Sequence, residues 1–287
     1  MSGNNTAFVT CLYSNLHGTP LGGRSARRHH YLQSLKTLLN TNCDFIVYAS
    51  EEDTEQIQQT EGLCNNPKLK VITEDIFQHP DLPFFQKKKK DLNIVNDDRC
   101  YEIMHSKARW LSNHANDGYD FIYWIDCGLS YGSLFPGKYR SGAGFAHWFS
   151  CSLFNETMVS NLNKSANNLI LLVADQKNNC MGPFPNDLLF DSVIEHKSRD
   201  YVVGGLFGGK SSDVLHFCES YFAILNKMKN LDVLQSEELL LTALYLQTPQ
   251  KFSPLIFTSW HPEDSDMAIY NKPDDVSFYK IFEKLNN

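Results

Sequence analysis

The pattern of apolar and polar positions in the first part of the chain predicts short buried strands separated by helices. Runs of β-branched and aromatic residues bounded by polar residues predict strands at 7–13, 44–50, 69–73 and 119–126. Apolar residues at helical spacing predict a helix around 31–39, and related patterns predict helices at 51–62 and 100–114. The charged stretch 75–98 shows neither period, and we expect irregular structure there.

The second part of the chain continues this alternation with longer helices. Apolar runs and apolar spacing predict strands at 168–174, at 201–203 and from 252 onwards, and helices at 211–229 and 235–247. Strands and helices that alternate in this way form a mostly parallel sheet flanked by helices. Because ligands bind such sheets at the carboxyl ends of the strands, we expect the residues after 7–13, 44–50 and 119–126 to line one site.

Composition and charge exclude some classes of function and leave the predicted fold unchanged. The chain has 287 residues, of which 42% are hydrophobic and 21% charged, with no linker or repeat, so we expect one domain. A formal charge of −7 argues against a nucleic-acid-binding protein, which needs a basic face. The sequence shows no secretory pattern and no window of about 18 apolar residues. We expect a cytoplasmic protein whose eight cysteines are free thiols.

Asp126 is the sharpest candidate for chemistry, because an acidic side chain ends an apolar strand there. Cys127, Gly128 and a turn follow, so Asp126 should lie at the carboxyl edge of the sheet. A carboxylate at that edge can bind Mg²⁺ or Mn²⁺, which bridge the oxygens of a diphosphate. The alternative interpretation is an aspartate that caps the turn.

Two more candidates lie in the second part of the chain. In the segment 204–209, two glycine pairs flank Leu206 and Phe207, and a backbone without Cβ atoms can approach a ligand closely. The glycine spacing fits neither common phosphate-binding motif, and a tight turn is the alternative. Glu237 and Glu238 begin a predicted helix, where one carboxylate can act as a general base. The alternative for this pair is complementarity to the helix dipole.

Several basic residues follow or precede the expected strand ends, where a diphosphate can be bound. They are Arg24, Arg27, Arg28, His29 and His30 after the first strand, and Lys107 and Arg109 on the helix before Asp126. Arginine and lysine are the usual partners of diphosphates, although a solvated basic face explains most single runs. We interpret the lysine run 87–90 as a solvated loop. His261 can supply an imidazole ligand to a metal, and a structural role is its alternative.

In chain order, these features resemble the shared elements of GT-A glycosyltransferases. Those elements are a metal-binding DxD at a strand end, a glycine-rich acceptor loop, an acidic pair that opens a helix, and a C-terminal histidine. The run WIDCGL at 124–129 fits a WIDxGL signature and is similar to the HtrL/YibB family of bacterial proteins, described as glycosyltransferases. That similarity spans most of the chain. The second acidic position of DxD is Gly128 here, so Asp126 alone offers a carboxylate.

The resemblance implies an α/β fold of GT-A-like, Rossmann-like type as one domain over 1–287, with a nucleotide-sugar-binding half at about 1–130 and an acceptor-binding half at about 131–287. The implied donor-binding residues are Tyr13, Ser14, Arg24, Arg28, Ser50, Lys107, Asp126, Cys127 and Gly128. The implied catalytic residues are Glu238 and Glu237, the acceptor-binding residues Gly205, Phe207, Gly208 and Gly209, and the ligands of Mn²⁺ or Mg²⁺ Asp126 and His261.

The implied reaction transfers a sugar from a nucleoside-diphosphate sugar, a UDP-sugar by preference, to a glycan or lipid-linked glycan in surface-polysaccharide synthesis. This interpretation is compatible with peripheral contact at the inner face of a membrane. Because a fold does not fix a reaction, two alternatives stay open. One is a catalytically silent carbohydrate- or nucleotide-binding module of the same fold. The other is a nucleotidyltransferase, which would release pyrophosphate instead of a nucleoside diphosphate.

Overall fold

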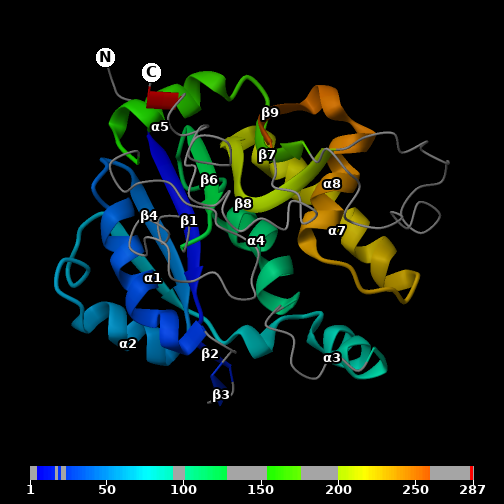
Figure 1. The fold of residues 1–287 in the computed structure, drawn as a ribbon, viewed down its shortest axis with the longest axis horizontal. Coiled ribbons are helices and arrows are strands. Elements are labelled where there is room, and N and C mark those ends of the chain that lie inside the picture. Colours follow the sequence, from blue (N-terminus) through cyan, green and yellow to red (C-terminus); the bar gives the residue numbers. More distant parts are fainter. Residues whose placement is uncertain are drawn as a thin grey trace, which may run out of the picture.

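A computed structural model describes the residues that form the fold, whose central feature is a mixed sheet (Figure 1). These residues are 5–16, 19–20, 24–92, 101–127, 154–175, 200–258 and 285–286. Seven strands form the sheet, in the order β5 (Leu69–Thr73), β4 (Asp44–Ala49), β1 (Thr6–Leu12), β6 (Phe121–Ile125), β8 (Asp200–Lys210), β7 (Leu169–Asp175) and β9 (Phe252–Thr258). A small ribbon of β2 (Asn15–Leu16) and β3 (Thr19–Pro20) follows β1.

Most neighbouring strands are parallel, which confirms the predicted α/β class. β1 pairs in parallel with both β4 and β6, β4 with β5, and β7 with β9, whereas β8 is antiparallel to β6 and β7. The chain runs outward from β1 through β4 to β5 and then returns to the other side of β1 as β6. This order is that of a Rossmann half, and its switch point lies between the carboxyl ends of β1 and β6.

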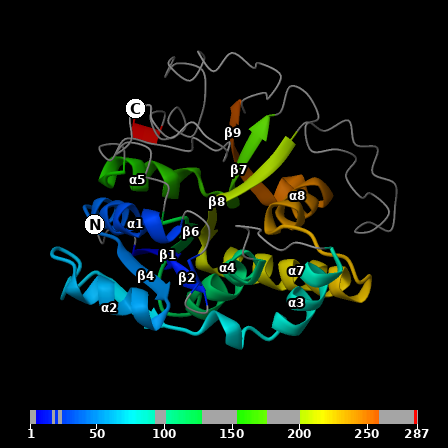
Figure 2. The ribbon, with the colours of Figure 1, turned by 60° about the horizontal axis from the view of Figure 1, so that its bottom comes forward.

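Helices cover both faces of the sheet and divide the core into two layers. The helices are α1 (Arg24–Leu38), α2 (Glu51–Gln59), α3 (Leu82–Asp91), α4 (Tyr101–His114), α5 (Glu156–Ser165), α7 (Ser211–Asn230) and α8 (Glu237–Gln247), with short 3₁₀ turns η1 (Ile76–Gln78) and η4 (Pro249–Lys251). Val9 belongs to the core cluster that includes residues of α4, α7 and α8, and Phe8 to the cluster that includes residues of α1, α2 and α5. The helices of the two sets are shown in Figure 2. Successive residues of β1 thus face opposite layers, as a strand buried on both faces requires.

The middle of the charged stretch after β5 is the helix α3, so the prediction of irregular structure was wrong for 82–91, as was that of a solvated lysine loop at 87–90; residues 93–98 lie outside the described residues. Phe85 anchors α3 in the core. Lys88 lies 2.5 Å from Asp232 at the end of α7, and Lys89 donates to both carboxylate oxygens of Glu102 on α4, at 2.8 and 2.7 Å. These acidic partners are distant in the sequence, so the local pattern alone could not indicate them.

The glycine-rich segment 204–209 lies inside β8, and the prediction of a loop there was also wrong. Phe207 pairs with Trp124 of β6 and with Leu171 of β7. Between Leu171 and Leu172 the register with β7 shifts, so that 204–206 have no partner on that side. This bulge lies beside the carboxyl end of β6. Bulges are common next to functional sites, because they redirect the backbone and its neighbours.

The length and the hydropathy of a helix decide whether it can cross a bilayer. A membrane-spanning helix needs roughly 20 consecutive, mostly apolar residues. Among the described residues, no helix meets both the length and the hydropathy that a membrane span requires.

Candidate functional site

Asp126 follows β6 directly and lies at the switch point of the sheet. Its amide donates to the carbonyl oxygen of Gly205 at 2.8 Å, which extends the β6–β8 pairing by one residue. Its Oδ1 accepts a hydrogen bond from Trp124 Nε1 at 2.8 Å and lies 3.1 Å from Lys107 Nζ. The side chain is 43% exposed. Asp126 therefore presents a carboxylate to solvent while one of its oxygens is held in place.

Lys107 projects from α4 into the interior and joins two carboxylates. Its Nζ donates to Glu237 Oε1 at 2.7 Å and to the carbonyl oxygen of Gly204 at 3.0 Å, in addition to its contact with Asp126. The ammonium group has three donors, and these three acceptors use all of them. Burial alone would lower the pKa of Lys107, but Asp126 and Glu237 together raise that pKa above its ordinary value. Lys107 is therefore a charged clamp, which corrects its predicted role as a diphosphate ligand.

The predicted catalytic pair at the start of α8 divides into one buried and one accessible carboxylate. Ser236 caps the helix by accepting from the amide of Leu239, so both glutamates lie in the first turn. Glu237 is buried against Lys107, and its Oε2 has no partner among the described residues. Glu238 is half-buried, and its Oε1 accepts from the amide of Gly204 at 3.2 Å. This geometry assigns Glu237 to the clamp and leaves Glu238 as the candidate proton acceptor.

Gly204 is required where the clamp meets the bulge of β8. A Cβ atom at this position would lie 2.6 Å from Glu237 Oε1 and 3.3 Å from Lys107 Nζ. A side chain there would displace the Glu237 carboxylate from its position beside Lys107. Gly205 also lies at this edge, because its carbonyl oxygen binds the amide of Asp126.

The other predicted acceptor-binding residues lie within the sheet and not at its edge. Phe207 is 1% exposed and packs in the core beside Trp124. Gly208 pairs with Tyr123 and Ile170, and Gly209 pairs with Ile122. Their backbones are used by neighbouring strands, so we withdraw the acceptor-binding role for these three residues.

The predicted donor-binding residues Ser14 and Ser50 are hydrogen-bonded to Asp53, a buried carboxylate in α2. Asp53 accepts from the Ser14 amide at 2.7 Å, from Ser14 Oγ at 2.5 Å and from Ser50 Oγ at 2.9 Å. The third predicted ligand, Tyr13, is buried and donates its hydroxyl to the carbonyl oxygen of Glu74 at 3.1 Å. These hydroxyls join strand ends to each other, which corrects their predicted contact with a ligand.

Cys127 is part of the core and not of an accessible site. Its carbonyl oxygen accepts from Ser34 Oγ at 2.5 Å and its Sγ contacts the carbonyl oxygen of Tyr31 at 3.4 Å. Burial, with smaller contributions from Asp126 and Asp53, raises the pKa of the thiol to about 12. The thiol therefore stays neutral and unreactive near neutral pH. Only the backbone of Cys127 is left for the predicted role in donor binding.

The remaining predicted ligands lie outside the described part of the chain, wholly or by their side chains. Gly128 and His261 lie outside the described residues, as do the side chains of Arg24 and Arg28, whose backbones belong to the first turns of α1. In the described ranges, no group of three or more His, Cys, Asp or Glu side chains is arranged to hold a metal ion. Asp126 offers one carboxylate with an ammonium group 3.1 Å away. This described donor set does not fit a divalent cation, which prefers several oxygen ligands.

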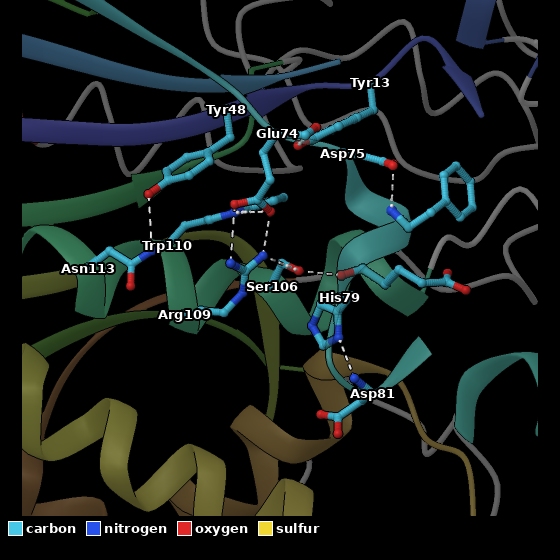
Figure 3. A network of polar contacts seen from close by, with 12 residues as sticks. Tyr13, Tyr48, Glu74, Asp75, His79, Asp81, Ser106, Arg109, Trp110 and Asn113 are labelled. Atoms are coloured by element: carbon cyan, nitrogen blue, oxygen red, sulfur yellow. Dashed lines mark hydrogen bonds and ion pairs between the residues drawn. The ribbon is translucent and has the colours of Figure 1, made fainter. Parts of the chain in front are cut away.

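A second polar network, which the sequence did not indicate, surrounds Glu74 at the same edge of the sheet (Figure 3). Glu74 follows β5, and Arg109 of α4 donates to both of its oxygens, at 3.2 and 2.5 Å. Trp110 Nε1 donates to Glu74 Oε1 at 3.1 Å. An acidic residue directly after the apolar run 69–73 is the same signal that identified Asp126, so this signal could have found Glu74.

Two stacked indole rings connect this network to the clamp. The ring centroids of Trp110 and Trp124 lie 5.9 Å apart with an interplanar angle of 18°. Each indole donates its N–H to one carboxylate, Trp110 to Glu74 and Trp124 to Asp126. Both carboxylates also pair with a cation from α4. The two acidic side chains are therefore fixed relative to each other by buried aromatic packing.

His105 anchors the segment that leads into α8. Its Nε2 donates to the carbonyl oxygen of Gln235 at 2.9 Å, because that oxygen can only accept, and its Nδ1 consequently accepts from the Tyr221 hydroxyl at 2.8 Å. The ring also stacks on Phe85. Burial lowers the pKa of His105 to about 4, and burial similarly lowers the pKa of His79 to about 4. Both rings are neutral at pH 7.

Stability is expected to fall as the pH decreases from 6.5 to 4. Unfolded histidine binds a proton below about pH 6.5 while folded His105 does not, so the free energy of unfolding decreases with falling pH in this window. The expected slope is about 1.4 kcal/mol per pH unit for this residue, or about 3 kcal/mol in total. Urea unfolding at several pH values should show a shallower slope for His105→Gln than for the unmodified protein. His216→Gln, at an exposed position, is the control, and equal slopes for all three proteins would contradict the expectation.

The sequence was also compared with known proteins. A scan against protein-family models and a search of curated proteins each find no match. The function of the chain is therefore inferred from the geometry of its own residues.

Proposed function

We propose that the protein is a GT-A-type glycosyltransferase that uses a nucleoside-diphosphate sugar. The observation that carries the proposal is the convergence of Asp126, Glu238 and the Lys107 clamp at the switch point of the sheet. These residues come from β6, α8 and α4 and are far apart in the sequence. An accessible pair of acidic side chains beside a Rossmann half is suited to a ligand that joins a nucleotide to a polar, uncharged group such as a sugar.

The diphosphate of the donor is assigned to the amino-terminal end of α1. This helix begins at Arg24, directly after the segment that leaves β1, so its first turn lies near the switch point. The first turn of α1 carries no acidic residue, and the helix dipole favours negative charge at this end. Because the first amides of a helix have no partner within the helix, an anion bound there can accept hydrogen bonds from them. Lys107, whose donors are all used, has no part in this step.

The transfer step is assigned to Glu238 and Asp126, whose side chains reach solvent at this edge of the sheet. In the inverting form of the reaction, the acceptor hydroxyl oxygen bonds to the anomeric carbon and its proton passes to Glu238. The bond from that carbon to the diphosphate oxygen breaks, and its electron pair leaves with the nucleoside diphosphate. Asp126 accepts hydrogen bonds from the sugar hydroxyls. No step is routed through a metal ion, and the acceptor is proposed to be a glycan or a lipid-linked glycan.

Donor binding is expected to depend on the Asp126 carboxylate. The purified protein is titrated by calorimetry with nucleotide sugars, with and without Mn²⁺, and release of nucleoside diphosphate is followed with candidate acceptors. Asp126→Asn keeps the shape but removes the charge, and should weaken donor binding about 10- to 100-fold by loss of charge-assisted hydrogen bonds. Glu55→Gln, at an exposed position on α2, is the control.

The other possible results of this experiment lead to different conclusions. Unchanged donor affinity in Asp126→Asn would remove this residue from the site. Sugar binding without any product would favour the silent binding module, and release of pyrophosphate would favour the nucleotidyltransferase. No binding of any nucleotide or nucleotide sugar would contradict the proposal.

A further inference from the structure

The nucleoside end of the site needs new residues, because the hydroxyls predicted for it are engaged elsewhere. Ser14 and Ser50 bind Asp53, and Tyr13 binds the Glu74 carbonyl oxygen. Among the described residues, the carboxylate of Glu74 and the guanidinium of Arg109 are two polar groups at this end of the edge. Their side chains are 22% and 27% exposed, so both reach solvent in part.

We propose that Glu74 and Arg109 form a binding site for the ribonucleoside part of the ligand. The proposal rests on the function proposed above and deepens it. Glu74 bridges the carboxyl ends of three strands of the Rossmann half: it follows β5, its amide donates to the Ala49 carbonyl oxygen of β4, and its own carbonyl oxygen accepts from Tyr13, which follows β1. In sheets of this kind, an acidic side chain at a strand end binds the hydroxyls of ribose.

The Glu74 carboxylate is rigid and still able to accept hydrogen bonds. Arg109 binds both of its oxygens, Trp110 Nε1 binds one of them, and Ser106 Oγ accepts from Arg109 at 3.4 Å (Figure 3). Each carboxylate oxygen has two lone pairs, so these contacts leave acceptor capacity for a ligand hydroxyl. Because the group is already oriented, binding costs little additional side-chain entropy.

Arg109 carries a donor that lacks a partner among the described residues. Its Nε is buried without a hydrogen bond, although native structures satisfy nearly all such groups. Carbonyl oxygens of a nucleobase are acceptors of the kind that a guanidinium group binds. The Glu74–Arg109 pair therefore offers an acceptor for the ribose hydroxyls and, through the exposed part of the Arg109 side chain, a positive charge beside the base.

The indole pair sets this site at a fixed position relative to Asp126. Trp110 binds Glu74, Trp124 binds Asp126, and both rings are buried and stacked. A ligand that reaches both carboxylates must present hydrogen-bond donors at its two ends. A nucleoside-diphosphate sugar has ribose hydroxyls at one end and sugar hydroxyls at the other.

The experiment compares nucleotides by calorimetry, using the full chain. Ribonucleoside diphosphates, their 2′-deoxy forms and inorganic pyrophosphate are titrated into the unmodified protein and into Glu74→Gln and Arg109→Lys. We expect the unmodified protein to bind its preferred ribonucleotide about 10- to 100-fold more tightly than the 2′-deoxy form. Glu74→Gln should reduce this ratio, and Arg109→Lys should weaken both nucleotides while leaving pyrophosphate unchanged.

The control is Asp81→Asn, which breaks an ion pair of similar exposure, 18% and 26%, between Asp81 and Lys229. It should bind all three ligands as the unmodified protein does. Equal affinity for ribo and deoxy forms, with full affinity in both variants, would overturn the Glu74–Arg109 site while leaving the proposed function intact. Failure of the unmodified protein to bind any nucleotide would overturn both. If a variant does not fold, the ligand series on the unmodified protein still decides the ribose claim.

Discussion

Replacing Lys107 by methionine is expected to lower the free energy of unfolding by about 3–5 kcal/mol, because it leaves the buried carboxylate of Glu237 without a cation. The ammonium group contacts Glu237, Asp126 and the Gly204 carbonyl oxygen. Methionine has a similar length and volume, so the loss measures the charge and its hydrogen bonds and not a cavity. Urea unfolding at pH 7, followed by circular dichroism, gives the quantity directly.

A second variant separates this explanation from general damage to α4. In Lys107→Met/Glu237→Leu the buried charge is removed together with its partner, and replacing a buried ion pair by apolar side chains is often neutral. The double variant should regain most of the lost stability, since Asp126 keeps its contact with solvent. Lys90→Met, an exposed lysine on α3, is the control and should change stability by less than about 0.5 kcal/mol. A loss below about 1 kcal/mol in Lys107→Met would contradict the clamp.

The strands of the sheet could be predicted from the sequence because their apolar runs are short, continuous and bounded by polar residues. β5 is observed at Leu69–Thr73, the predicted residues, and β4 and β6 differ from prediction only at their ends. α3 could not be predicted, because its stabilising partners Asp232 and Glu102 are distant in the chain. β8 was predicted only at 201–203, because its glycines indicate a turn locally, whereas pairing with both β6 and β7 extends the strand through them.

The position of the candidate site followed from one rule, and the roles of its residues did not. The rule that ligands meet strands at their carboxyl ends pointed to Asp126 and Lys107, the GT-A resemblance added Glu238, and the structure places the three together. Their roles depend on which hydrogen bonds are already used. Sequence spacing cannot show that Lys107 has no free donor, or that Asp53 binds Ser14. Such facts depend on side-chain packing in three dimensions.

Gly208→Ala is expected to destabilise the protein by about 3–5 kcal/mol or to prevent folding, because β8 is packed against the backbone of β6 at this residue. A Cβ atom would lie 2.3 Å from the Ile122 carbonyl oxygen and 2.6 Å from Tyr123 Cα, and neither backbone atom can move away cheaply. The φ angle of 144° adds strain for any residue with a side chain. Soluble yield and urea unfolding measure the effect.

The neighbouring glycine provides a matched control for this prediction. At Gly209 a Cβ atom would meet Leu169 Cα at 3.5 Å, an ordinary contact, in the same strand and sheet. Gly209→Ala should therefore cost less than about 1 kcal/mol, since it adds a contact without strain and restricts the unfolded chain. Equal losses for the two variants would show that alanine disturbs β8 for a reason other than the approach of β6. A large difference would establish that the close packing of β8 on β6, which also holds Gly204 and Gly205 beside Asp126, depends on the absence of a side chain at Gly208.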